Sequence, residues 1–294
     1  MPKKPKFIKA RGGKPNASAE RKYRNELLRI VNEINSLIRQ KIVPILKRDG
    51  KPIDVVADSV EVNDGPVAEI TEAFAVIQGL LSLDDRENKG VGSAFVGSVA
   101  ATTNAKTSAM LERAGFALPT NRDIIARQGL TEALDALTAE NASLVTKMSQ
   151  EYIDRIQRAV LDNYLTGKYV GNGGVLKELG RISGITKKRA KLIARDQSNK
   201  IHGTVTRLQA QATGSAGYEW NNVRDERVRG NPSGKYPNSK YNHWDRDGEY
   251  FLWKPMKNPP ISPNGKPFRQ PPKDGMPGEP INCRCFASPV WIEQ

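Results

Sequence analysis

The chain has 294 residues, of which 38% are hydrophobic and 6% aromatic, enough for one large domain or two ordinary ones with a lean core. Forty-six Lys and Arg face 32 Asp and Glu, and the net charge of +14 favours a polyanionic partner such as nucleic acid, although a solvated basic surface without a ligand gives the same balance. No run of about 18 apolar residues occurs, so we expect a soluble protein without a membrane-spanning segment, and the basic N-terminus lacks the apolar stretch of a secretory signal.

Residues 1–17 are rich in cations and proline and contain no acid, so they cannot bury much apolar area. We expect a basic flexible arm. Such an arm either contacts nucleic acid or a partner, or is a tail without a function. The candidate DNA contacts in it are Lys3, Lys4, Lys6, Lys9, Arg11 and Lys14.

A mainly helical region is predicted over residues 18–212. Apolar residues recur at steps of three and four from Leu27 to Ile45, and Pro44 should kink or end that helix. A second helix should begin at Asp64 and Pro66, and later patterns cover 122–138 and 141–165. The turn-rich stretch LTGKYVGNGG separates these from a helix predicted over about 175–212.

The last predicted helix carries cations at four-residue steps. Lys187, Lys191 and Arg195 line up on one face, where they could meet phosphate groups. The same pattern is found on ordinary solvated helix faces. His202 lies on the polar side of this helix, where a histidine is usually solvated.

Residues 213–294 form a different kind of segment. YEWNNVRDERVR alternates like a strand, YFLW at 250–253 predicts a short strand, and most prolines of the chain lie between these motifs and the C-terminus. We therefore expect an α+β protein, with a helical N-terminal region and a small, irregular β-containing C-terminal module.

Both cysteines of the chain, Cys283 and Cys285, lie in PGEPINCRCFASPV. Three interpretations compete: a disulfide, a metal site, or a packed structural turn. A disulfide across one intervening residue would be strained, so it is the least favoured. On an extended segment, residues i and i+2 face the same way, so both thiols can point at one spot.

A zinc site needs about four ligands, preferably thiolate and imidazole. Cys283, Cys285 and His243 offer three, and Asp225, Asp245 or Asp247 could supply a fourth. The C-x-C spacing is atypical for zinc, so the expectation is no cofactor, with zinc as the alternative. No motif for a nucleophile, a metalloprotease or a phosphate-binding loop appears, and an enzyme is therefore not expected.

The region from about 141 to 290 resembles the phage Mu F-like family of head morphogenesis proteins, also called minor head proteins. The resemblance rests on an ordered series of segments: NASLVTKMSQEYIDRIQRAVLDNYLTGK, GITKKRAKLIARDQSNK, YEWNNVRDERVR, His243 with DGEYF, and PINCRCF. The insertion GNPSGKYPNSKYN before His243 departs from the family pattern.

The resemblance implies a structural protein of a tailed-phage head, present in several copies near the portal or inside the shell and associated with packaged DNA. Its expected partners are the portal protein, the major capsid protein and double-stranded DNA, and its expected locations are the virion head and, during assembly, the host cytoplasm. The alternatives are a metal-dependent nuclease or hydrolase, and a plain DNA-binding protein. Carried over by position, the family's candidate metal ligands are Asp225, His243, Asp247, Cys283 and Cys285.

Overall fold

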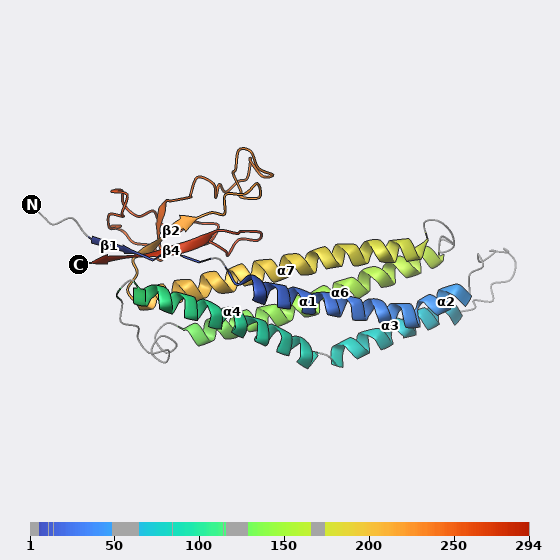
Figure 1. Ribbon diagram of the computed structural model, residues 1–294. Coiled ribbons are helices and arrows are strands. Elements are labelled where there is room, and N and C mark those ends of the chain that lie inside the picture. The colour runs from blue at the N-terminus through green and yellow to red at the C-terminus, as the bar shows by residue number, and fades with distance from the viewer. Residues whose placement is uncertain are drawn as a thin grey trace, which may run out of the picture. The chain divides into compact units, whose positions relative to one another are not determined.

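The computed structural model describes residues 6–10, 12–13, 15–48, 65–83, 85–113, 115, 129–165 and 174–293. Long helices dominate the first two thirds of the chain, and a small antiparallel sheet is completed near the C-terminus (Figure 1). The α+β class predicted from the sequence is confirmed. Among the described residues, no helix combines the length and apolarity needed to cross a membrane.

Two compact units interleave along the chain. The first, here called the sheet unit, comprises residues 1–20, 94–138 and 195–294, and the second, the helical unit, comprises residues 21–93 and 139–194. The sequence pattern instead predicted a boundary at about residue 212. The difference arises because the last helix is continuous while its two halves pack into different units.

Six helices are described: α1 (Ala17–Lys41), α2 (Val43–Arg48), α3 (Gly65–Leu83), α4 (Asp85–Arg113), α6 (Leu130–Leu165) and α7 (Val175–Ala212). In the helical unit, apolar stripes on α1, α3, α6 and α7 are fully buried, as Leu27, Phe74 and Ile156 illustrate. A polar chain also ties three of these helices together. The Tyr152 hydroxyl donates to Asn35 Oδ1 at 2.5 Å, and Asn35 Nδ2 donates to Ser183 Oγ at 3.1 Å.

Most predicted helices occur, with shifted ends. The first breaks at Ile42, and Pro44 follows in the first turn of α2, where a missing N–H is harmless. The patterns predicted at 122–138 and 141–165 belong to one helix, α6, whose described part begins at Leu130. The glycine- and alanine-rich stretch 85–113 also forms a helix, α4. Asp64, expected to begin the second helix, lies outside the described residues.

The sheet has the order β1-β4-β2-β3, with β1 (Lys6–Lys9), β2 (Gly217–Asn221), β3 (Tyr250–Leu252) and β4 (Phe286–Glu293), and every neighbouring pair is antiparallel. In β1, Lys6 pairs with Glu293 and Lys9 with Val290, so the segment expected to be a flexible arm contributes an ordered edge strand. One sheet face buries Tyr218, Trp220 and Trp291 with residues of α4 and α7, and the other buries Tyr250, Phe268 and Val290.

The strand predicted over 218–229 is shorter than expected. β2 ends at Asn221, because Asp247 and Trp244 then hold Asn222 through its backbone N–H and its side-chain amide, and residues 225–234 follow as turns. The predicted strand at 250–253 is β3. The two cysteines precede β4 rather than lying in it.

Candidate functional site at the Cys-Arg-Cys turn

The turn that carries both cysteines is held by polar side chains of α7. Asp196 Oδ1 accepts the backbone N–H of Asn282 at 3.1 Å, and Asn199 Nδ2 donates to the carbonyl of Cys283 at 2.8 Å. Arg195 also binds the side chain of Asn282, which has a left-handed backbone with φ of 62°. Side chains of α7 thus supply hydrogen-bond partners for main-chain groups of the turn that have no partner in a helix or strand.

Two glycines let the turn lie directly against the helix. A Cβ on Gly203 of α7 would lie 2.8 Å from the carbonyl oxygen of Pro277, and a Cβ on Gly278 would lie 2.8 Å from the carbonyl oxygen of Asn199. Gly278 also has a φ of 92°, which favours glycine. The main chains of α7 and the turn therefore approach as closely as their backbones allow.

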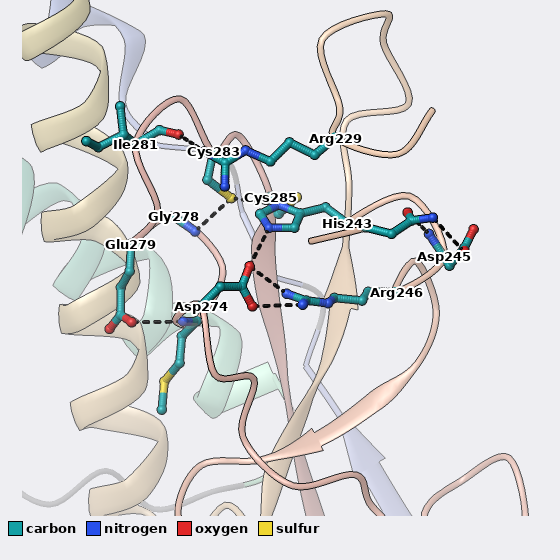
Figure 2. Close-up of polar contacts among 12 residues, drawn as sticks. Arg229, His243, Asp245, Arg246, Asp274, Gly278, Glu279, Ile281, Cys283 and Cys285 are labelled. Atoms are coloured by element: carbon teal, nitrogen blue, oxygen red, sulfur yellow. Dashed lines mark hydrogen bonds and ion pairs between the residues drawn. The ribbon is translucent and has the colours of Figure 1, made fainter. Parts of the chain in front are cut away.

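Cys283, Cys285 and His243 form a buried cluster (Figure 2). His243 Nδ1 lies 3.6 Å from Cys283 Sγ and 3.8 Å from Cys285 Sγ, and the three donor atoms lie within 4.8 Å of one another. The exposed fractions of the three residues are only 1–6%. The backbone N–H of Gly278 adds a hydrogen bond to Cys283 Sγ at 3.4 Å.

The imidazole of His243 is oriented from its other nitrogen. Its Nε2 lies 2.9 Å from Asp274 Oδ2, and Arg246 donates to both carboxylate oxygens of Asp274, at 3.2 and 2.7 Å. An ionised carboxylate only accepts, so Nε2 carries a proton, and Nδ1 faces the thiols as an acceptor when the ring is neutral and as a donor when the ring is charged. Burial raises the pKa of Asp274, but the hydrogen bonds from Arg246 and His243 outweigh it and leave that pKa below its ordinary value.

The two thiols differ in acidity. A hydrogen bond from Cys285 lowers the pKa of Cys283 well below that of a free thiol, against the effect of burial, and His243 lowers it further. The hydrogen bond with Cys283 and burial raise the pKa of Cys285 well above that of a free thiol. Removal of the first proton from the pair is therefore easier than removal of the second.

The donor set fits the first three positions of a tetrahedral zinc site. Zn–S and Zn–N bonds of about 2.3 and 2.0 Å at tetrahedral angles separate sulfur from nitrogen by about 3.5 Å. The separations from His243 Nδ1 to the two sulfurs, 3.6 and 3.8 Å, agree with that value, and a carboxylate on the remote imidazole nitrogen is usual for a metal-bound histidine. Among the described residues, the cluster contains no fourth His, Cys or carboxylate ligand. The same distances also fit a cluster without metal, in which hydrogen bonds link the two thiols and the imidazole.

Aromatic and cationic side chains close the cluster on the sheet side. The ring of Trp220 in β2 meets the His243 ring edge-on, with centroids 5.1 Å apart, and the Arg246 guanidinium lies 4.9 Å from the Trp220 ring centroid. Trp220 itself is fully buried. This packing leaves the donor atoms little access to solvent.

The structure brings together three of the five expected metal ligands, and the two aspartates engage cations elsewhere. Asp225 accepts the backbone N–H of Arg227 at 3.0 Å and pairs with Arg284, the residue between the cysteines. Asp247 accepts the backbone N–H of Asn222 at 2.8 Å and pairs with Arg224. Asp245, the other acid considered, bonds Asn242. These carboxylates fix the turns that surround the cluster.

The expected DNA contacts lie in several settings. Lys3, Lys4, Arg11 and Lys14 lie outside the described residues. Lys6 is exposed on β1, and Lys9 pairs with Glu219 of β2. On α7, Lys191 is exposed, Lys187 is half-buried, and Arg195 holds the Cys-Arg-Cys turn.

Sequence reasoning missed the residues that orient the histidine and hold the turn, namely Asp274, Arg246 and Asn199. A signal for Asp274 exists, because it is the only acidic residue between Tyr250 and Gly278. His202 also differs from expectation. It is 7% exposed, and burial lowers its pKa to about 4, so it is a neutral buried residue rather than a solvated one.

Comparison with curated proteins finds an uncharacterized protein of Haemophilus influenzae (strain ATCC 51907 / DSM 11121 / KW20 / Rd) that is 32% identical over 162 residues. The matched region covers 55% of this chain and 30% of the relative, so this chain spans about a third of the length of the relative. No protein family and no solved structure matches the chain.

Proposed function

We propose that this chain is a structural minor head protein of a tailed bacteriophage, which aids head assembly and the packaging or retention of DNA. In this function, the cluster of His243, Cys283 and Cys285 and the turn that carries the cysteines form a structural unit, here called the knot, rather than a catalytic centre. The proposal combines the resemblance of residues 141–290 to Mu F-like proteins with the arrangement of the segments that carry that resemblance.

The supporting observation is that four of those segments meet at the knot. Residues 195–199 of GITKKRAKLIARDQSNK hold the turn, and Arg229 of the DERVR segment donates to the carbonyl of Ile281 at 2.6 Å. His243 binds both cysteines of PINCRCF, and its backbone N–H donates to the carbonyl of Arg229 at 2.9 Å. These segments are far apart in the sequence but build one buried knot. We expect this arrangement if the resemblance to Mu F-like proteins reflects a common structural module.

The burial of the knot favours a structural function over hydrolysis. A catalytic metal keeps a coordination position open to substrate, whereas the three donors here are 1–6% exposed and lie beneath Trp220. The net charge of +14 supports the part of the proposal that concerns DNA, because a protein inside a filled head lies close to concentrated phosphate.

The test is the composition of purified particles. Heads are separated by density gradient from a lysate of the strain that carries this reading frame, and the chain is quantified against the major shell protein by mass spectrometry. We expect the chain in head fractions at far below the copy number of the shell protein. Its absence from heads that contain portal and shell would overturn the proposal.

A second assay addresses the hydrolase. Purified chain is incubated with duplex DNA and Mg²⁺, Mn²⁺ or Zn²⁺, alongside His243→Ala. We expect no cleavage by either protein. Metal-dependent cleavage that disappears in the variant would replace the structural function with a nuclease.

A further inference from the structure

A cavity of about 510 Å³ lies in the sheet unit, and the proposed function makes no use of it. Its walls come from the segment after β1, from α4 and from α7. Its ten lining residues include Lys9, Gly12, Lys106, Thr107, Arg113 and His202. Its volume is in the range of pockets for small molecules, about 300–1,000 Å³.

The cavity is lined by cations and by no described acidic residue. Lys106 and Arg113 lie two turns apart on one face of α4, both are exposed, and neither forms an ion pair within the described part of the chain. Lys9 is partly neutralised by Glu219. Two uncompensated positive charges therefore remain at the cavity, and they favour an anionic ligand.

The wall formed by the segment after β1 is held in place by the rest of the sheet unit. The backbone N–H of Gly12 donates to Ser288 Oγ at 2.9 Å, and a Cβ on Gly12 would collide with the carbonyl oxygen of Ala287. His202 Nε2 lies 2.7 Å from the carbonyl of Gly13, and its Nδ1 lies 3.1 Å from Thr103 Oγ1. A carbonyl only accepts, so Nε2 donates and Nδ1 accepts from the hydroxyl. His202 thus fixes the Gly12–Gly13 segment, and the imidazole is neutral because burial lowers its pKa to about 4.

We propose that this cavity binds a phosphate-bearing anion of nucleotide size. Lys106 and Arg113 contact the phosphate, because a lysine and a guanidinium together neutralise a dianionic group and the guanidinium donates to two of its oxygens at once. Met110 and Ala10, which also line the cavity, give apolar surface for the rest of the ligand. The inference goes beyond the proposed function and does not depend on it.

The test uses isothermal titration calorimetry on the full chain with adenosine 5′-monophosphate, inorganic phosphate and adenosine. We expect the monophosphate to bind, inorganic phosphate to bind more weakly, and adenosine to bind at least about tenfold more weakly than the monophosphate, since the charged hydrogen bonds are absent. Equal affinity for adenosine and its monophosphate, or no monophosphate binding at millimolar concentration, would overturn the proposal.

The matched variants are Lys106→Gln with Arg113→Gln in the cavity and Lys177→Gln with Lys188→Gln at exposed positions of α7. Both pairs remove two charges from helix positions, and all four side chains are exposed, so folding should survive in both. We expect the cavity pair to weaken monophosphate binding by about tenfold or more and the α7 pair to leave it unchanged. Equal losses in the two variants would indicate attraction by net charge and would sink the proposal of a defined site.

The phosphate can belong to a free nucleotide or to the end of a nucleic-acid strand. A short 5′-phosphorylated oligonucleotide and its unphosphorylated twin are therefore used as competitors of the monophosphate. Competition by the phosphorylated strand alone indicates that the cavity accepts strand ends. Competition by neither indicates a site for free nucleotides, and equal competition by both would contradict recognition of a terminal phosphate.

Discussion

The cluster of His243, Cys283 and Cys285 replaces the long elements that the C-terminal segment lacks. Residues 253–285 contain turns and isolated bridges but none of the strands of the sheet, so few regular backbone hydrogen bonds hold them. The cluster fastens the end of this segment to the loop that carries His243, and α7 fastens it from the other side through Asn199. Loss of the cluster should therefore be felt by the sheet unit and much less by the helical unit.

The first prediction concerns the thiols. Cys283→Ser with Cys285→Ser should lower the free energy of unfolding of the sheet unit by roughly 2–4 kcal/mol, because two buried hydroxyls replace groups matched to His243. All four tryptophans (Trp220, Trp244, Trp253 and Trp291) lie in this unit. Urea unfolding followed by tryptophan fluorescence therefore reports on the sheet unit, while far-UV circular dichroism reports mainly on the helices.

The alanine pair, Cys283→Ala with Cys285→Ala, separates packing from metal binding. If packing holds the turn, the alanine variant should be milder than the serine variant, and a chelator should not change the wild type. If zinc holds it, both variants should be equally severe, metal analysis should find about one ion per chain, and chelation should reproduce the loss. A serine variant as stable as the wild type would show that the thiols hold nothing.

A second prediction concerns Asp274, whose side chain is 4% exposed between His243 and Arg246. Asp274→Asn removes one partner of a buried ion pair and should cost on the order of 3 kcal/mol at pH 7. The pKa of Asp274 is lower in the folded protein than in the unfolded chain, so its stabilising effect is complete above the unfolded pKa of about 3.9 and is lost as the pH falls through the folded value.

The stability difference between wild type and Asp274→Asn should accordingly be constant from pH 7 to about 5 and should close below about pH 4. Urea unfolding at a series of pH values, read by tryptophan fluorescence, measures it. A difference that persists unchanged to pH 3 would mean that the charge of Asp274 is not what stabilises the site.

For single residues, the sequence predicted the members of the cluster but not the residues that orient and hold them, such as Asp274 and Asn199. Cys283 and Cys285 are the two cysteines of the chain, and His243 is one of its two histidines. These residues could be selected as candidates because their residue types are rare in this sequence. Asp225 and Asp247 were chosen by proximity in sequence to these motifs, but each meets an arginine of its own loop or of the Cys-Arg-Cys turn. Asp274 was missed because a carboxylate that orients a histidine has no fixed spacing from it.

Among the elements, α7 carries two kinds of glycine. Gly203 faces the turn, where a Cβ would meet the carbonyl oxygen of Pro277, whereas a Cβ on Gly184 would meet nothing within 4 Å. The same substitution on the same helix should therefore have opposite effects at the two positions.

The third prediction follows from this contrast. Gly203→Ala should destabilise the sheet unit by about 1–3 kcal/mol, because the helix and the turn must move apart. Gly184→Ala should raise stability by roughly 0.5–1 kcal/mol, because alanine favours a helix more than glycine does. The midpoint of thermal unfolding, measured for both variants and the wild type, tests the two predictions. A stabilising Gly203→Ala would disprove the close approach of the two backbones.

Elements with long apolar periodicity were the predictable part of the fold. The stripe on α7, from Ala190 to Leu208, is buried as expected, because helix packing repeats the same contact every turn. β1 was not predictable: its four residues, KFIK, resemble a basic arm, and only pairing with β4 makes them a strand. Pairing across nearly the whole length of the chain leaves no local pattern in either partner.

At the scale of the whole molecule, the net charge of +14 is spread over both units and does not identify a ligand surface. Some cations have structural partners: Arg195 holds Asn282, and Arg284 holds Asp225. Neutralising these would change stability together with any binding. A test of binding alone therefore requires substitution of exposed cations that make no structural contact of this kind.

The last prediction is that the chain binds duplex DNA without sequence preference and with an affinity that falls steeply as salt rises. Each phosphate contact contributes a slope of about 0.9 in a plot of log affinity against log salt, because it releases bound counterions. If Lys187 and Lys191 both contact phosphates, Lys187→Gln with Lys191→Gln should reduce the slope by about 2. Fluorescence anisotropy with a labelled duplex over a range of salt concentrations measures it. The variant Lys22→Gln with Lys41→Gln removes the same charge from exposed positions of α1 and serves as the control. A slope that is unchanged by the α7 pair would remove this helix face from the DNA interface, and one that changes equally in both variants would mean that only the total charge matters.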